Sequence, residues 1–148
     1  MKIKDKMTKT IITANINENI NDISKLMKEY DIGFIPIEDN NKIIGIITDR
    51  DIVINNVYNN DNNIKDYISA NIISIDENED LEKALDQMKQ HKIKRLLVTN
   101  DNKVTGIISL SDLLNEIDSN TLLEALKEIY QIDKNEHDYK PEIDNFYL

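Results

Sequence analysis

The sequence predicts an α+β fold built from two copies of one β-α-β-β-α unit, followed by a C-terminal helix. A shift of 61 residues, which places Gly45 on Gly106, aligns the two halves of the chain without a gap. Short β-branched runs and amphipathic stretches then follow in the same order in both halves. Because a unit of about 60 residues is marginal for folding alone, we expect the two units to pack together and share a core.

The repeated positions extend over most of both halves. A gapless series of matches that ends in the same Gly–apolar–apolar–hydroxyl–x–x–Asp string indicates a duplication. The aligned segments are Ile3-Lys4-Asp5 with Ile64-Lys65-Asp66, Ile11-Ile12-Thr13 with Ile72-Ile73-Ser74, Lys42–Thr48 with Lys103–Ser109, and Asp51-Ile52 with Asp112-Leu113. We therefore expect repeats at 1–60 and 61–118, with 119–148 left for a C-terminal segment.

The first repeat begins with a β-branched run over 11–14, which predicts a strand. Asn19 is the expected N-cap of an amphipathic helix that Gly33 ends. The apolar residues at helical spacing are Ile20, Ile23, Leu26, Met27 and Tyr30. The remaining predicted elements are a strand over 34–37, a tight turn at 39–41, a strand over 43–48 and a helix over 49–57.

The second repeat follows the same order after a polar linker at 58–63. Its predicted elements are strands over 72–75, 96–99 and 104–109, a turn at 100–102, a helix over 81–91 with Asp80 as N-cap, and a helix over 111–117. Thr121 and Glu124 fit a capping box. An apolar stripe follows, so we expect a C-terminal helix over about 121–132 and a polar tail from Asp133 onward.

The composition excludes several classes of function. Eighteen Lys and Arg against 28 Asp and Glu give a formal net charge of −10, which repels nucleic-acid backbones and anionic membrane surfaces. The absence of cysteine excludes disulfides, zinc fingers and thiol catalysis. Three glycines are too few for a Gly-rich phosphate loop. Without a long apolar run or a secretory leader, we expect a cytoplasmic protein without nucleic-acid or membrane partners.

The string from Gly45 to Asp51 carries the first candidate site. Thr48 ends an apolar strand and Asp51 lies in the first turn of the next helix. Free N–H groups at a helix start favour an anion, and a carboxylate beside them can accept hydrogen bonds from the hydroxyls of a ribose. A glycine within the strand permits a close neighbour, either ligand or backbone. Ser109 and Asp112 repeat the arrangement in the second half.

A purely structural interpretation of this string stays open. A hydroxyl at a helix start is a common N-cap, and an aspartate in the first turn complements the helix dipole. Two copies in equivalent places of a duplicated unit make the functional interpretation more specific. We therefore take Thr48, Asp51, Ser109 and Asp112 as the principal candidate residues.

With these residues in view, the chain resembles a tandem pair of cystathionine-β-synthase (CBS) domains, also called a Bateman module. The resemblance covers about Ile3 to Ile117, and the stretch Gly45–Val53 is close to the pattern of small stand-alone bacterial members. The segments that carry it are Ile64–Ile68, Asp31–Ile37, Gly45–Val53 and Gly106–Leu113. The resemblance implies two repeats packed sheet to sheet about a pseudo-twofold axis, with two clefts between them and often a homodimer.

The resemblance also implies a ligand and its contacts. Members bind adenosine-containing ligands, so AMP, ADP or ATP is expected, with NAD or S-adenosylmethionine less favoured and no obligatory cofactor. The ribose and phosphate contacts carry over to Thr48 with Asp51 and to Ser109 with Asp112. The further base-pocket or phosphate candidates are Ile12, Thr13, Ile73, Ser74, Phe34, Pro36, Arg50, Lys94 and Arg95.

The two repeats differ at positions where the family contacts its ligand. Lys94 and Arg95 offer cations to a phosphate, whereas the first repeat has Gly33 and Phe34 there. Leu97 stands where the family tends to have proline, as the first repeat does at Pro36. We therefore expect unequal clefts. Arg50 and the Lys94–Arg95 pair also have a plain interpretation as solvated charges near helix ends.

The sequence is consistent with two functions. The first is a regulatory module that senses an adenine nucleotide and signals to an unidentified protein partner by a change of packing. The second is an interaction or dimerisation protein that kept the fold and lost the ligand. An enzyme is not expected, since no catalytic or metal-ligating constellation accompanies His91 or His137.

Overall fold

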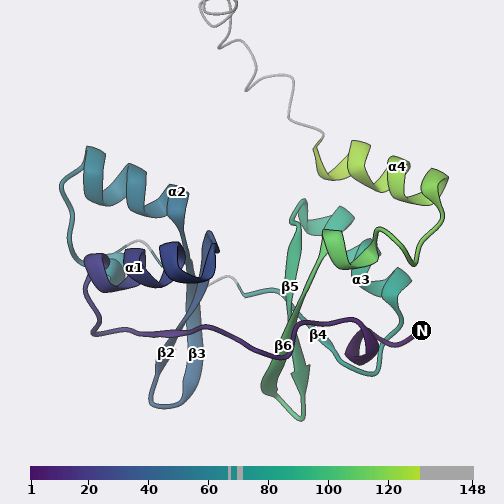
Figure 1. Ribbon diagram of the computed structural model, residues 1–148, viewed down its shortest axis with the longest axis horizontal. Helices are drawn as coiled ribbons and strands as arrows, with labels where there is room; N and C mark the ends of the chain where they lie inside the picture. Colours follow the sequence, from purple (N-terminus) through teal and green to yellow (C-terminus); the bar gives the residue numbers. More distant parts are fainter. Residues whose placement is uncertain (67, 70–71, 131–148) are drawn as a thin grey trace, which may run out of the picture.

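Two three-stranded sheets face each other at the centre of the molecule, with helices on their outer sides (Figure 1). The computed structural model describes residues 1–66, 68–69 and 72–130. The first lobe contains β1 (Ala14–Asn15), α1 (Ile20–Tyr30), β2 (Phe34–Asp39), β3 (Lys42–Thr48), α2 (Asp49–Asp51) and η2 (Ile52–Tyr58). The second lobe contains β4 (Ser74–Asp76), α3 (Leu81–His91), β5 (Arg95–Asn100), β6 (Lys103–Ser109), η4 (Leu110–Leu113) and α4 (Ser119–Ile129). The predicted α+β class and the duplicated element order are confirmed.

Both sheets have the same topology and register. In the first lobe β1 runs parallel to β2, and β2 runs antiparallel to β3 with Ile35 opposite Ile47. The second lobe repeats this pattern, with Leu96 opposite Ile108. The hairpin turns that join the antiparallel strands have two consecutive residues at positive φ. They are Asn40 and Asn41 in one lobe and Asp101 and Asn102 in the other, residue types that tolerate this left-handed region.

The first strand of each repeat starts later than the sequence predicts. Instead of 11–14, β1 covers Ala14–Asn15, and β4 covers Ser74–Asp76 instead of 72–75. The apolar residues that suggested longer strands lie in an extended segment that passes between the lobes before it joins a sheet (Figure 1). A short β-branched run has the same sequence pattern whether its extended backbone is paired in a ladder or not.

The first helix of each repeat agrees with the prediction at its start and differs at its end. The Asn19 side chain accepts a hydrogen bond from the backbone N–H of Asp22 at 2.9 Å, as expected of an N-cap. However, α1 ends at Tyr30 because Asp31 adopts the left-handed conformation with φ of 52°. The prediction that Gly33 ends this helix was wrong. Asp80 occupies the N-cap position of α3, without a side-chain capping bond.

The helices that follow the third strands also differ from prediction. The segment predicted as a helix over 49–57 forms α2, which continues into the π-helix η2. The predicted helix over 111–117 is a single 3₁₀ turn, η4. The C-terminal helix starts at Ser119, where Asp118 accepts a hydrogen bond from the backbone N–H of Thr121. The predicted capping box at Thr121 was therefore misplaced. The helix ends at Ile129, with Tyr130 as its C-cap, so the predicted end near residue 132 was also wrong. The polar tail predicted from Asp133 onward lies outside the described residues.

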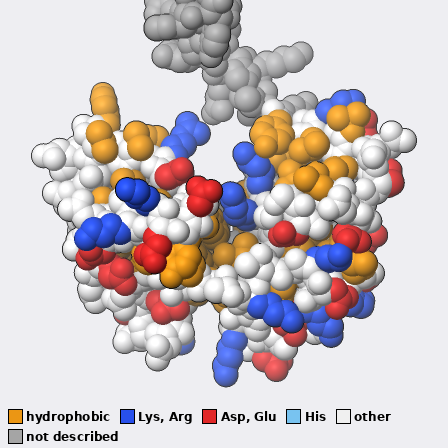
Figure 2. Space-filling model, in the orientation of Figure 1, with side chains coloured by type: hydrophobic (Ala, Val, Ile, Leu, Met, Phe, Trp, Pro, Cys, Tyr) orange, Lys and Arg blue, Asp and Glu red, His pale blue; other side chains and the backbone are white. Residues whose placement is uncertain are grey.

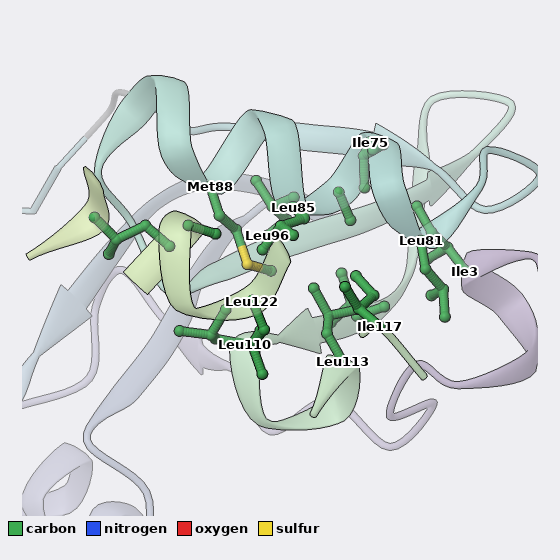
Figure 3. Packing of buried hydrophobic residues seen from close by; sticks show 14 of the residues in the cluster. Ile3, Ile75, Leu81, Leu85, Met88, Leu96, Leu110, Leu113, Ile117 and Leu122 are labelled. Carbon is green, nitrogen blue, oxygen red and sulfur yellow. The ribbon is translucent and has the colours of Figure 1, made fainter. Parts of the chain in front are cut away.

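Each lobe has its own hydrophobic core. The leading segment of each repeat packs into the core of the lobe formed by the other repeat, so the two leading segments are exchanged. The first-lobe core includes Ile64, and the second-lobe core includes Ile3. The expectation of one shared core was wrong. Figure 3 shows Ile3 beside Leu81, on the edge of the cluster between α3, η4 and α4. Each short 3₁₀ segment, η1 (Ile3–Asp5) and η3 (Ile64–Asp66), thus packs against the lobe formed mainly by the other repeat.

Hydrogen bonds and an ion pair fix the first exchanged segment. The N–H of Ile3 donates to the carbonyl of Glu79 at 2.9 Å. Lys2 Nζ lies 3.0 Å from Asp80 Oδ1. The hydrogen bond from Lys2 lowers the pKa of the Asp80 carboxyl. The start of the chain is therefore anchored on the second lobe.

Two glycines allow the exchanged leading segments to pack closely against β3 and β6. A Cβ on Gly45 would lie 2.8 Å from the carbonyl oxygen of Ser69, and a Cβ on Gly106 would lie 2.9 Å from that of Thr8. Backbone hydrogen bonds join the same segments, because the amides of Thr8 and Ile107 each donate to the other's carbonyl at 2.9 Å. The close neighbour that the sequence left open is therefore backbone.

Candidate functional site

Two clefts lie between the lobes, and each is lined by both repeats. The Ser109 cleft has a volume of about 220 Å³ and is lined by Thr8, Thr10, Ile12, Asp31, Ile32, Gly33, Phe34, Arg95, Ile107, Ser109 and Asp112. The Thr48 cleft has a volume of about 270 Å³ and is lined by Phe34, Ile46, Thr48, Ser69, Ile73, Ile93, Lys94, Arg95 and Leu97. Many of these positions correspond under the 61-residue shift, so the clefts are pseudo-equivalent.

Each cleft combines the Thr/Ser residue of one repeat with residues from the leading segment of the other repeat. Ser109 and Asp112 of the second repeat meet Ile12 of the first, and Thr48 of the first repeat meets Ile73 of the second. The reason is the exchange of leading segments, which places the residues before β1 against β6 and those before β4 against β3. A molecule bound in either cleft would therefore contact both repeats.

Each Thr/Ser–Asp pair is held by a local hydrogen-bond network. Oδ2 of Asp51 accepts from the N–H of Thr48 at 2.9 Å and from its hydroxyl at 2.8 Å. Oδ2 of Asp112 accepts from the N–H of Ser109 at 2.7 Å and from its hydroxyl at 2.8 Å. These contacts form capping boxes. Among the described residues, Oδ1 of each carboxylate has no hydrogen-bond partner, so it remains available to a ligand.

The backbone N–H groups expected to bind an anion at the start of α2 already have protein acceptors. The N–H of Asp49 donates to the carbonyl of Gly33 at 3.0 Å, that of Arg50 to the Asp49 side chain at 2.8 Å, and that of Asp51 to the Thr48 hydroxyl at 3.2 Å. The expectation of free helix-start N–H groups was wrong here, because the carbonyl of Gly33 and the side chains of Thr48 and Asp49 accept these hydrogen bonds.

Phe34 and Arg95 occupy equivalent positions in the two repeats and line both clefts. The Arg95 guanidinium lies 6.0 Å from the centre of the Phe34 ring, within the range of a cation–π contact. Lys94 lines the Thr48 cleft and stacks over Tyr130 at the end of α4, with Nζ 4.7 Å from the ring centre. Both cations therefore lie beside the clefts, as the sequence suggested.

Several predicted site residues lie elsewhere. Thr13 lines a different hollow, between the two hairpin turns. Pro36 is buried in β2, Ser74 is exposed in β4 and Arg50 is exposed in α2, and none of them lines either cleft. Asp51 does not line the Thr48 cleft itself, although its carboxylate is bonded to Thr48, which does. For Thr13, Pro36 and Ser74 the alternation of extended segments explains the difference, since neighbouring side chains point to opposite faces. Arg50 and Asp51 lie in the helix α2 instead.

Several lining residues were not predicted from the sequence. They include Thr8, Thr10 and Ser69, which precede the predicted first strands, and Asp31 and Ile93, which precede the second strands. One available signal was the pair of glycines at 45 and 106, which required a close neighbour without identifying it. Within residues 1–66, 68–69 and 72–130, no group of three or more His, Asp or Glu side chains could hold a metal ion.

Comparison with known proteins identifies the family of this chain. The model of the CBS domain family matches residues 3–55 and 64–119. The chain belongs to the CBS domain family. Both matched segments correspond to the repeats found from the sequence, so the resemblance is confirmed.

Relatives of similar length exist among both sequences and structures. The chain is 32% identical to the uncharacterized protein YlbB of Bacillus subtilis, over 93% of this chain and 97% of that protein. It is 31% identical to the CBS domain-containing protein YhcV of the same organism, over 86% and 94%. The CBS domain pair of protein MJ0100, solved with 5′-methylthioadenosine and S-adenosyl-L-methionine, superposes with a TM-score of 0.70 and 29% identity, over 78% of this chain and 94% of that one.

In the part of the chain that the structure describes, no helix is both long and apolar enough to cross a membrane.

Proposed function

We propose that this chain is a regulatory module that binds an adenosine-containing ligand in the clefts between its repeats. AMP, ADP and ATP are the favoured ligands, and NAD and S-adenosylmethionine are the alternatives. Support comes from the MJ0100 domain pair, which is 29% identical and was solved with two adenosine derivatives. The proposal includes no catalytic step, and relatives of the same length are likewise CBS-domain proteins.

The arrangement of Asp112 is the observation that carries this proposal. Its carboxylate lies in the Ser109 cleft, and two hydrogen bonds from Ser109 hold one of its oxygens. The second oxygen is a fixed acceptor, and a fixed acceptor can bind the vicinal hydroxyls of a ribose at low entropic cost. Apolar residues of the same cleft, such as Ile12 and Phe34, provide surfaces for an adenine ring.

Because residues of both repeats line each cleft, ligand binding can change the arrangement of the lobes and so act as a signal. Because a bound ligand touches both repeats, it stabilises the arrangement of the lobes that fits it best. A partner protein that prefers one arrangement would then bind with an affinity that depends on the ligand. This is the coupling that a regulatory module requires.

A thermal-shift panel with AMP, ADP, ATP, NAD, S-adenosylmethionine and 5′-methylthioadenosine tests the proposal, with GTP as the control for base selection. A ligand at about 100 times its dissociation constant stabilises a protein by roughly 2.7 kcal/mol. For a domain near this size, we expect a rise in Tm of about 5–10 °C. Asp112→Asn should reduce this rise, and Asp51→Asn should do so if the Thr48 cleft is occupied.

Asp101→Asn is the matched control. It makes the same change in a hairpin turn and outside both clefts, so the ligand-induced shift should remain. The proposal fails if no adenosine derivative raises Tm, or if the double variant Asp51→Asn/Asp112→Asn binds as tightly as the unmodified protein.

The second candidate function is an interaction protein without a ligand. One observation favours it: the η2 helix exposes an apolar face. Val53, Ile54, Val57 and Tyr58 are between 45% and 85% exposed. Such a face is typical of a surface that is covered in an assembly. A stable dimer with no response to the ligand panel would support this alternative.

A further inference from the structure

A hollow lies between the two hairpin turns, at the opposite end of the sheets from the Thr48 and Ser109 clefts (Figure 1). We name it the hairpin hollow. Its volume of about 730 Å³ is larger than that of either cleft and lies in the range of small-molecule sites. Figure 2 shows the surface recessed between the lower ends of the two lobes. The hairpin hollow shares no lining residue with either cleft.

A β-bulge in each hairpin turns one apolar side chain toward the hairpin hollow. The ladder register skips Ile44 in the first lobe and Thr105 in the second. Strict alternation would place Ile43 on the face of Ile47, which is fully buried in the core. The extra residue reverses this direction, so Ile43 lines the hollow together with Val104. The same irregularity in both repeats thus provides apolar surface from both lobes to one hollow.

Charged side chains of both signs line the hairpin hollow. Lys42 and Lys103 occupy equivalent positions under the 61-residue shift, one in each lobe. Glu38 comes from the first lobe and Asp101 from the second. Within the part of the chain that the structure describes, none of these four side chains takes part in an ion pair. The lining therefore offers two cations and two carboxylates to a ligand, with no net charge.

A zwitterion matches this lining better than an ion of one sign. An anion would meet the carboxylates as well as the ammonium groups, and a cation would meet the reverse. A zwitterion satisfies both, because its carboxylate accepts from the lysines and its ammonium group donates to the carboxylates in charge-assisted hydrogen bonds. Ile11, Ile43 and Val104 add apolar surface for an aliphatic side chain.

One extended segment separates the hairpin hollow from the Ser109 cleft. Ile12 lines the cleft, whereas its neighbours Ile11 and Thr13 line the hollow. Successive side chains of an extended segment point to opposite faces, which explains this division. The two places can therefore be occupied together, and residues of one can be changed without touching the other.

We propose that the hairpin hollow binds an α-amino acid with an apolar side chain between the two lobes. The carboxylate of the amino acid lies toward Lys42 and Lys103, and its ammonium group lies toward Glu38 and Asp101. This site goes beyond the adenosine-binding function proposed above and does not depend on it. A bound amino acid would link the hairpin of one repeat to that of the other.

Calorimetric titration of the full chain with L-valine, L-leucine, L-isoleucine and L-methionine tests the proposal. We expect at least one of these amino acids to bind at millimolar concentration or below. Two analogues of the tightest ligand then probe the charges: the carboxylic acid without the ammonium group, and the amide without the carboxylate. Each should bind at least about 10-fold more weakly than the amino acid, as hydrogen bonds to charged groups imply.

Lys42→Gln and Glu38→Gln each remove one charge from the hollow, and each should weaken binding of the amino acid by about 10-fold. Lys28→Gln and Glu29→Gln are the matched controls, since they remove the same charges from α1, outside the hollow. Both controls should keep the affinity of the unmodified protein. An unchanged circular dichroism spectrum verifies the fold of each variant.

The proposal is overturned if none of the four amino acids binds, if either analogue binds as tightly, or if both hollow variants keep full affinity. A crossed pair of variants separates this site from the adenosine clefts. Asp101→Asn should weaken amino-acid binding and keep the rise in Tm with adenosine ligands, and Asp112→Asn should do the reverse. Absence of amino-acid binding with a retained adenosine response overturns only the hollow, and the opposite result overturns only the function proposed above.

Discussion

Asp112 and Asp51 show how one side chain can have a structural and a ligand-binding role. In each, Oδ2 completes a capping box with the preceding hydroxyl residue, while Oδ1 has no partner among the described residues. The two interpretations that the sequence left open are thus compatible, because a carboxylate has two oxygens and about four acceptor sites. The capping bonds also restrict the carboxylate to one orientation.

At the same scale, Asp118 makes the stability of α4 depend on pH. Hydrogen bonds from Thr121 lower the pKa of the Asp118 carboxyl. A group with a lowered pKa in the folded state adds stability above its ordinary pKa and loses it as the pH falls through the folded value. We expect Tm to fall below about pH 4, and we expect this loss to be smaller in Asp118→Asn, which keeps the capping oxygen without the titration.

Thermal unfolding followed by circular dichroism between pH 6 and 2.5 measures this difference. Glu29→Gln, on α1 in the other lobe, controls for the change in net charge. Equal acid sensitivity of Asp118→Asn and the unmodified protein would show that this cap does not contribute.

At the scale of elements, the exchanged leading segments hold the lobes together. Ile3 is fully buried in the second-lobe core, and Ile64 is 3% exposed in the first-lobe core. The short η1 segment could not be stable by itself, since one 3₁₀ turn fixes too few hydrogen bonds. Its burial against α3 and η4 therefore supplies the stabilisation, and it positions Thr8 and Thr10 in the Ser109 cleft.

Ile3→Ala tests how much this contact contributes to the stability of the fold. Removal of a fully buried isoleucine side chain to alanine costs about 2–5 kcal/mol when the site cannot collapse. Urea unfolding should show this loss in the free energy of unfolding. Leu123→Ala, at a position that is 50% exposed on α4, is the control and should change stability by less than about 1 kcal/mol. A loss for Ile3→Ala no greater than that of the control would contradict the anchoring role.

At the scale of the whole molecule, the apolar face of η2 points to self-association. Val57 and Tyr58 are 71% and 85% exposed, and η2 lies on the outer side of the first lobe (Figure 1). A homodimer is an expectation from the family resemblance, and burial of apolar surface is the main driving force of such association. We propose that this face contacts a second copy of the chain.

Val57→Glu places a charge in the centre of this face. We expect the unmodified protein to sediment as a dimer and the variant as a monomer at micromolar concentration, because an unpaired charge in an interface is costly. Analytical ultracentrifugation distinguishes the two states. Asn17→Glu adds the same charge at an exposed loop position and should leave the dimer intact. A dimer that persists in Val57→Glu would place the interface elsewhere.

The sequence by itself determined the features that depend on neighbours along the chain. The duplication, the order of elements, the hairpin turns at Asn40 and Asp101, and the Thr48–Asp51 and Ser109–Asp112 pairs all follow from local hydrogen bonding and periodicity. These features are set within a few residues, so one sequence is enough to recognise them.

The tertiary structure decided which repeat completes each cleft. Only the packing of distant segments shows that Ile12 meets Asp112 and that Ile3 joins the core of the other lobe. The structure also shows that the N–H of Asp51 in α2 donates to the capping Thr48 side chain. It places Tyr130, which follows α4, under the Lys94 ammonium group. Such pairings depend on contacts between residues far apart in the chain, and local patterns contain no information on which of the two pseudo-equivalent partners is chosen.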